Sequence, residues 1–432
     1  EYFQYLVEIG FKEIEVAFPA ASQTDFDFVR YLIEGQHIPD DVSIQVITQA
    51  RPELIERTMA SVLGAKQAIV HVYNATAPVF REQVFQMSRE QVKDLAVAAV
   101  RQIKAWCEQH PETRWTLEYS PETFCMTELD FSTEVCLAVM AEWQPNAEFP
   151  LILNLPATVE VNTPNVYADQ IETMIEVLQI NPHTTISVHP HNDRGTGVAA
   201  AELAQLAGAT RVEGCLFGNG ERTGNVDLVT LAMNLYTQGI HPQLDFSNMA
   251  KAVAMAEKMT ALPVHPRHPY AGELVFTAFS GSHQDAIKKG FAWRNKRPVS
   301  PWQVPYLPLD PQDVGATYEA VIRVNSQSGK SGAAWILQQN HGLALPVYLQ
   351  KHFSLCVQNH TEQFGQEISI AQIWSLFRQQ YGLQAESALT LHDYGFVAEG
   401  GRLQAKIVGV EGEENLHGKG NGIIAAWVHA LS

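Results

Sequence analysis

Seven short runs rich in β-branched and other apolar residues recur in the first part of the chain, and amphipathic helical patterns separate them. They cover residues 13–18, 43–48, 68–73, 115–119, 151–155, 185–189 and 211–217. A new run every roughly 25 to 45 residues is typical of βα units that build a parallel sheet. The alternation therefore restricts this part of the chain to an α/β fold.

Two architectures fit the alternation, an open doubly wound sheet and a closed (β/α)8 barrel. An open sheet gathers its site at one switch point, whereas a barrel carries site residues at the C-terminal ends of many strands. Nearly every run here is followed by polar or reactive residues, among them Ser22, Arg51, Asn74, Glu122, Glu160, Asp193 and Glu221. We therefore predict a TIM barrel of which these runs are strands two to eight, and we expect its first strand to precede residue 1.

The pattern changes to helices and proline-rich loops after about residue 245. We predict a barrel domain over residues 1–272, a linker subdomain over 273–329, a helical subdomain over 330–386 and a partial α+β domain over 387–432. In the last of these, two strand-like runs flank a turn at residues 399–401, and a glycine loop at residues 418–422 opens a helix.

Composition indicates a cytoplasmic enzyme. No apolar stretch approaches the roughly 18 residues that a membrane-spanning helix needs. The formal net charge of −18 argues against nucleic acid or an anionic membrane as a partner, because both require clustered Lys and Arg. Five scattered cysteines without CxxC spacing are typical of reduced thiols, so we expect no disulfides.

His189 and His191 lie at the end of one predicted strand. Residues two apart on a strand face the same side, so both imidazoles can reach one metal ion. Two imidazoles with oxygen donors suit Mg, Mn or Zn rather than copper or an iron–sulfur cluster. The alternative is that the two histidines only form hydrogen bonds in the mouth of the barrel.

Three other features bear on chemistry. The glycine-rich run at residues 218–225 can bring the Asn225 amide oxygen close to the metal, or it is simply a tight turn. Glu118 and Glu122 stand at another strand end, where one of them can act as an acid or base or form a salt bridge at the rim. His283 lies in a loop of small residues, where a mobile catalytic group is expected.

Several long motifs together closely resemble the 2-isopropylmalate synthase family in its longer form. The resemblance implies a metal-dependent Claisen condensation of acetyl-CoA with 3-methyl-2-oxobutanoate, which yields 2-isopropylmalate and CoA in leucine biosynthesis. The motifs cover residues 18–26, 118–122, 154–160, 189–196, 213–225, 280–290 and 302–308.

The resemblance also implies residue roles. The divalent metal is assigned to His189 and His191, with Asn225 as a further or nearby ligand. The keto acid is assigned to His71, Ser120 and Thr158. Catalysis is assigned to Glu122 in the barrel and to His283 and Tyr306 from the linker region, which we expect to reach the barrel of a partner subunit.

One feature of the family is absent from this sequence. The first barrel strand of the family carries an Arg-Asp pair, whose Asp completes the metal site and whose Arg contacts the keto acid. The resemblance further implies a homodimer, a monovalent cation such as K⁺, and leucine as a feedback inhibitor that binds the partial regulatory domain at residues 387–432.

Two alternative functions remain open at the level of sequence. Homocitrate and citramalate synthases share the metal site and differ in the pocket for the keto-acid side chain. The second alternative is an inactive dimeric leucine-binding homologue.

Overall fold

The structure is a computed structural model, and it describes residues 1–278, 280–297, 301–316, 332–364, 368–383, 389–409 and 412–431. The chain divides into two compact units. The first comprises Glu1–Val275 with Leu309–Ala316, and the second comprises Phe276–Pro308 with Thr317–Ser432.

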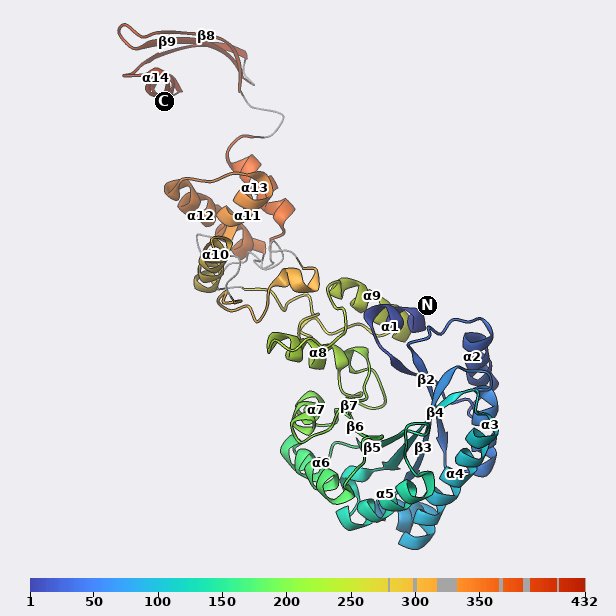
Figure 1. Ribbon diagram of the computed structural model, residues 1–432. Helices are drawn as coiled ribbons and strands as arrows, with labels where there is room; N and C mark the ends of the chain where they lie inside the picture. Colours follow the sequence, from blue (N-terminus) through green and yellow to red (C-terminus); the bar gives the residue numbers. More distant parts are fainter. Residues whose placement is uncertain are drawn as a thin grey trace. The chain divides into compact units, whose positions relative to one another are not determined.

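The first unit contains a parallel seven-stranded sheet whose strands lie in sequence order, surrounded by helices (Figure 1). The strands are β1 (Glu13–Ala17), β2 (Ser43–Gln49), β3 (Gln67–Ala75), β4 (Arg114–Glu122), β5 (Leu151–Ala157), β6 (Thr184–Pro190) and β7 (Arg211–Val212). The helices that follow them are α2 (Gln23–Glu34), α3 (Pro52–Ser61), α4 (Arg89–Gln109), α5 (Leu129–Trp143), α6 (Pro164–Leu178), α7 (Gly197–Leu206) and α8 (Leu228–Thr237).

The sheet curves as a barrel does. Its strand order never reverses, which excludes the doubly wound alternative. The end strands β1 and β7 form no ladder with each other in the described part of the chain, yet Nε of Arg211 lies 2.6 Å from Oε2 of Glu13 across the gap between them. The predicted barrel of seven visible strands is therefore confirmed.

Burial explains why these runs form strands. Every residue of β5 is buried, and the large side chains of Trp115, Leu117 and Tyr119 from β4 fill the core. Near-continuous burial is expected where a parallel sheet has side chains packed on both of its faces. The helix α1 (Tyr2–Ile9) precedes the first strand, and Gly10 ends it with φ of 122°.

β7 is shorter than predicted, because only two of the residues in 211–217 pair with β6. Beyond them, the backbone N–H of Cys215 donates to the carbonyl of Val226 instead of to a neighbouring strand. The chain then turns through a short 3₁₀ segment, η3 (Leu216–Gly218). This early turn folds the glycine-rich run back over the strand ends.

Connections at the strand ends contain two further short segments, a π-helix η1 (Phe80–Phe85) and a 3₁₀ turn η2 (Phe124–Met126). The first unit closes with α9 (Met249–Thr260) and the 3₁₀ turn η4 (Pro311–Val314). No helix in the described ranges is long and apolar enough to cross a membrane.

The second unit has a helical part and a small sheet. Its helices are α10 (Gly281–Asn295), α11 (Gly332–His341), α12 (Val347–Phe364) and α13 (Ile370–Gln380). An antiparallel sheet of β8 (Leu389–Val397), β9 (Arg402–Gly409) and β10 (Gly412–Lys419) precedes α14 (Ile423–Leu431). The predicted domain boundaries at residues 329–330 and 386–387 lie outside the described residues.

β10 was not expected from the sequence, which predicted only two strands here. Its residues are mainly polar and exposed, so they show no apolar alternation, and pairing with β9 alone makes them a strand. Gly418 therefore belongs to β10 rather than to the predicted glycine loop. A Cβ at Gly418 would lie 1.9 Å from the carbonyl oxygen of Ala426, so this glycine permits the close approach of α14.

Candidate active site

The strands β3, β4 and β5 bring three polar side chains together in the barrel interior. Nε2 of His71 lies 2.7 Å from Oγ of Ser120, and Nδ2 of Asn154 donates to the same hydroxyl at 3.0 Å. All three residues are buried. Two of the predicted substrate residues, His71 and Ser120, are thus direct neighbours, and Asn154 holds them in place.

Glu122 is the last residue of β4, and Thr158 directly follows β5 at the same end of the sheet. The backbone N–H of Thr123 donates to Oγ1 of Thr158 at 2.9 Å, so the Thr158 hydroxyl hydrogen can point elsewhere. Burial raises the pKa of Glu122, and repulsion from Glu221 adds to this effect. A carboxylate with a raised pKa is a stronger base than an ordinary glutamate.

His189 has an acceptor at each ring nitrogen. Its Nδ1 lies 2.9 Å from Oε2 of Glu213, and its Nε2 lies 3.3 Å from Oδ1 of Asn225. The rings of His189 and His191 stack with centroids 5.3 Å apart and planes inclined by 16°. The predicted metal residues therefore converge on one place, as the two-residue period of a strand requires.

Two hydrogen bonds donated by its own nitrogen orient the side-chain amide of Asn225. Its Nδ2 donates to Sγ of Cys215 and to the carbonyl of Asn219, both at 3.2 Å, which turns Oδ1 toward His189. Nε2 and Oδ1 are both metal-ligand atoms, and their separation is close to the roughly 3 Å expected between neighbouring ligands at about 2.1 Å from one ion. The donor set at this point therefore fits a divalent cation.

His191 differs from His189 in its hydrogen-bond partner and in its pKa. Arg222 donates to its Nδ1 at 3.1 Å, and its pKa is lowered to about 4 by burial, with the charges of His189 and Arg222 adding to the effect. The ring is neutral near pH 7, and its Nδ1 lone pair is engaged. His191 can join a metal site only where Arg222 releases this nitrogen.

Arg222 ties three strand ends together, and sequence reasoning missed it. It donates to Asp193 at 2.7 Å and to the carbonyl of Thr158 at 2.6 Å, in addition to its contact with His191. The signal in the sequence was an arginine inside the glycine-rich run at residues 218–225. Its partners are 29 to 64 residues away, so only the fold identifies them.

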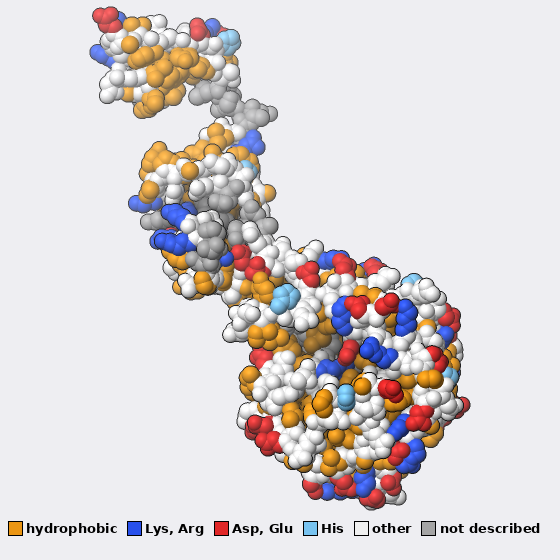
Figure 2. Space-filling model, in the orientation of Figure 1, with side chains coloured by type: hydrophobic (Ala, Val, Ile, Leu, Met, Phe, Trp, Pro, Cys, Tyr) orange, Lys and Arg blue, Asp and Glu red, His pale blue; other side chains and the backbone are white. Residues whose placement is uncertain are grey.

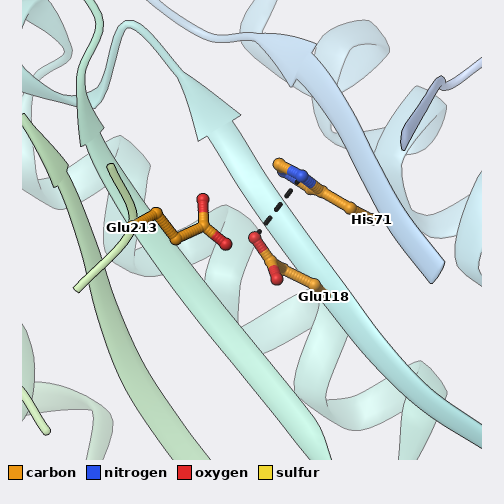
Figure 3. Close-up of side chains that lie close together, drawn as sticks. All are labelled: His71, Glu118 and Glu213. Atoms are coloured by element: carbon orange, nitrogen blue, oxygen red, sulfur yellow. Dashed lines mark ion pairs between the residues drawn. The ribbon is translucent and has the colours of Figure 1, made fainter. Parts of the chain in front are cut away.

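Two carboxylates and an imidazole meet in the barrel interior (Figure 3). His71, Glu118 and Glu213 bring three ligand-type atoms within 4.8 Å of one another, a group that could hold a metal ion. Nη1 of Arg211, however, lies 2.5 Å from Glu213 and 3.4 Å from Glu118. The guanidinium already supplies the positive charge that these carboxylates need, so we favour His189 and Asn225 as the metal position.

The pKa values of Glu118 and Glu213 are shifted in opposite directions. Glu118 is fully buried, and burial followed by repulsion from Glu213 raises its pKa well above the ordinary value. Burial also acts to raise the pKa of Glu213, but Arg211 and His189 outweigh it, so Glu213 stays ionised. Glu118 does pair with Arg211 and His71, but it does so in the interior and not at the predicted rim, since β4 directs it inward.

A cavity of about 420 Å³ opens between the end strands of the sheet. Tyr2, Phe11 and Ile14 form part of its apolar wall, while His189 and Asn225 stand at its polar end. The cavity gives the candidate metal position access to a small ligand.

His283 and Tyr306 belong to the second unit and lie together there. Their rings stack with centroids 4.0 Å apart and planes inclined by 25°. His283 is in the first turn of α10, and Tyr306 is exposed with φ of 64°. The two rings are therefore direct neighbours, while the role of these residues at a barrel remains a prediction.

Two families of known proteins match successive parts of this chain. Residues 1–255 match the family described as HMGL-like, and residues 273–338 match the post-catalytic domain of alpha-isopropylmalate synthase. A solved HMG-CoA lyase from Bacillus subtilis is 18% identical, with a TM-score of 0.46 over 61% of this chain and 86% of that chain.

Two curated relatives cover this chain from end to end. The 2-isopropylmalate synthase of Marinomonas sp. (strain MWYL1) is 63% identical over 434 residues, which span 100% of this chain and 78% of the relative. That of Ralstonia pickettii (strain 12J) is 59% identical over 433 residues, which span 100% of this chain and 75% of the relative. The chain therefore belongs to the 2-isopropylmalate synthase family.

Proposed function

We propose that the strand ends of the barrel catalyse the metal-dependent condensation of acetyl-CoA with 3-methyl-2-oxobutanoate. The observation that carries the proposal is the pairing of Nε2 of His189 with Oδ1 of Asn225 beside a ring of buried polar side chains. Family membership supports this reaction over the alternative of an inactive leucine-binding homologue.

His189 and Asn225 would hold the divalent cation, with His191 as a third ligand once Arg222 releases it. Mg, Mn and Zn all accept imidazole with oxygen donors. When bound, such a cation would polarise the keto carbonyl and stabilise the alkoxide that develops on it. The protein's own contribution is to orient these ligands and to bury the polar groups around them.

The keto acid would bind beside the metal position through His71, Ser120 and Thr158. The Thr158 oxygen accepts from the Thr123 N–H, so its hydroxyl hydrogen can donate to a carboxylate of the substrate. Ser120 is held between His71 and Asn154, which fixes where its oxygen lies. These contacts would place the carbonyl carbon for attack and cost little reorganisation.

Glu122 would remove a proton from the methyl group of acetyl-CoA, and the resulting carbanion would attack the keto carbon. The alkoxide oxygen formed by this attack takes up a proton, and water then hydrolyses the thioester, so the products are 2-isopropylmalate, CoA and a proton. The raised pKa of Glu122, which comes first from burial, supports its role as the base. His283 and Tyr306, reaching the barrel of a partner subunit, would assist in proton transfer.

The direct test follows release of the CoA thiol with both substrates, with and without Mg²⁺ or Mn²⁺. His283→Ala should lose most of its kcat while binding of metal and keto acid is kept, and an unchanged kcat would exclude this role. Product analysis with several 2-oxo acids separates the sister enzymes. Preference for pyruvate would indicate a citramalate synthase, and preference for 2-oxoglutarate a homocitrate synthase.

We also propose, from the family, a cytoplasmic homodimer that leucine inhibits through the domain formed by β8–β10 and α14. Figure 2 shows an apolar area on this domain. Among the residues of the domain, Leu391, Val397 and Ile424 are exposed. Exposed apolar surface of this kind is typical of an interface with further protein. Light scattering tests the dimer, and the effect of leucine on CoA release tests the inhibition.

A further inference from the structure

The carboxylate of Glu213 is held by four side chains in the barrel interior. Its Oε1 accepts from Arg211 at 2.5 Å and from Gln45 at 3.2 Å. Its Oε2 accepts from Asn154 at 3.1 Å and contacts Nδ1 of His189 at 2.9 Å. An ionised carboxylate can accept about four hydrogen bonds, so this environment suits the charged form and leaves little freedom to move.

Arg211 anchors this arrangement from the other side. Besides Glu213, it donates to Oγ of Ser187 at 3.0 Å and to Oε1 of Gln45 at 2.9 Å. Glu213 is therefore oriented by a cation that has its own fixed partners. The carboxylate in turn fixes the ring of His189, which contacts its Oε2 atom.

The two ring nitrogens of His189 compete for one proton when the imidazole is neutral. A carboxylate attracts an N–H more strongly than a neutral amide oxygen does, so the proton belongs on Nδ1, facing Glu213. Nε2 then keeps its lone pair, and this lone pair faces Oδ1 of Asn225 at 3.3 Å.

We propose that Glu213 is a positioning residue that holds His189 in the Nδ1–H tautomer and thereby keeps Nε2 open for a divalent metal. The inference rests on the proposed function, because that function places the metal at His189. A hydrogen-bonding partner on the second nitrogen is the usual way in which proteins orient a ligating imidazole. Neither the sequence motifs nor the resemblance gave Glu213 this role.

Glu213→Gln tests the proposal because it keeps the shape of the side chain and removes the charge. Arg211 requires an acceptor, so the amide oxygen would turn to Arg211 and the NH₂ group to His189. The NH₂ group donates, which makes Nδ1 the acceptor and moves the ring proton to Nε2. The metal-binding lone pair is then lost.

Glu118→Gln is the matched control. Glu118 is fully buried, while the Glu213 side chain is 11% exposed, and Glu118 also contacts Arg211, at 3.4 Å, but no contact joins it to His189 among the described residues. Its raised pKa, due first to burial, keeps it protonated, so glutamine mimics its neutral form. The control therefore separates an effect on the imidazole from a general disturbance of the buried cluster.

The experiment uses the whole chain and two measurements. Titration with Mn²⁺ followed by electron paramagnetic resonance gives the dissociation constant, which we expect to rise about 10- to 100-fold in Glu213→Gln and to stay within about threefold in Glu118→Gln. Long-range ¹⁵N NMR of the histidine rings identifies the tautomer in the absence of metal. The spectra are recorded at a pH roughly two units above the ordinary histidine pKa, so that the ring is neutral. We expect Nδ1–H in the parent and Nε2–H in Glu213→Gln.

Parent-like Mn²⁺ affinity in a folded Glu213→Gln variant would overturn the proposal, and so would an equal loss in Glu118→Gln. If Glu213→Gln does not fold by circular dichroism, Glu213→Asp replaces it. Retraction of the carboxylate should weaken Mn²⁺ binding, and unchanged binding would refute the inference. A parent that binds no Mn²⁺ would refute the metal site itself, while the tautomer measurement would still judge the role of Glu213.

Discussion

Two arginines that contact the same carboxylate offer a controlled test of how the connection between β4 and α5 is held. Arg81 donates through both of its terminal nitrogens to Glu128, at 2.9 and 2.8 Å, and also to the carbonyl of Thr76 at 2.6 Å. Arg89 lies 3.0 Å from Glu128. The side chain of Arg81 is 8% exposed, and that of Arg89 is 40% exposed.

We expect Arg81→Met to lower the free energy of unfolding of the first unit and Arg89→Met to change it little. Breaking a buried ion pair costs about 3 to 5 kcal/mol, because one charge is left without its partner. Glu128 is 36% exposed, so water can rehydrate it after the substitution. We therefore expect a loss of about 2 to 3 kcal/mol for Arg81→Met and a clearly smaller loss for the exposed Arg89→Met.

Thermal unfolding followed by circular dichroism measures both variants. The loss in Arg81→Met corresponds to a decrease of roughly 5 to 10 °C in the Tm of the first unit. Both arginines lie over the ring of Phe131, at 4.9 and 5.3 Å from its centroid, so the methionine replacements leave comparable apolar contacts. Equal Tm values for the two variants would refute the argument that burial decides the difference.

The pH dependence provides a second check. Hydrogen bonding from Arg81 lowers the pKa of Glu128 from 4.5 to about 2, against the opposing effect of burial. Because the folded pKa lies below the unfolded value, the stabilisation is fully present above pH 4.5 and is lost as the pH falls toward about 2. Arg81→Met should lose less stability than the parent across this window.

Three further predictions concern the site. Glu122→Gln should lower kcat by about 10²- to 10⁴-fold and remove the rise of kcat with pH through the raised pKa, as the pH–rate profile would show. Cys215→Ala frees the Asn225 amide and should weaken Mn²⁺ binding in the same titration, whereas Cys215→Ser keeps an acceptor and should weaken it less. Gly224→Ala should lower the Tm and the Mn²⁺ affinity together. Gly224 has φ of 101°, and a Cβ there would lie 1.8 Å from the carbonyl oxygen of Gly218. Normal Mn²⁺ affinity would refute the role of this turn.

Local patterns in the sequence predicted much of the barrel. The strands β1 to β6 lie within a few residues of the predicted runs, because burial on both faces of a parallel sheet leaves a continuous apolar signal. β7 and β10 were the exceptions. Backbone pairing with Val226 ends β7 early, and pairing with β9 makes a strand of polar β10, and neither effect can be read from local periodicity.

The same division holds for the site. The two-residue period of a strand was enough to predict that His189 and His191 face the same side, and in the structure their rings stack. The tertiary structure decided which of these histidines presents an open nitrogen. Arg222, 31 residues from His191, engages one ring, whereas Glu213 orients the other, because hydrogen bonds between sequence-distant side chains depend on where the strands end in space.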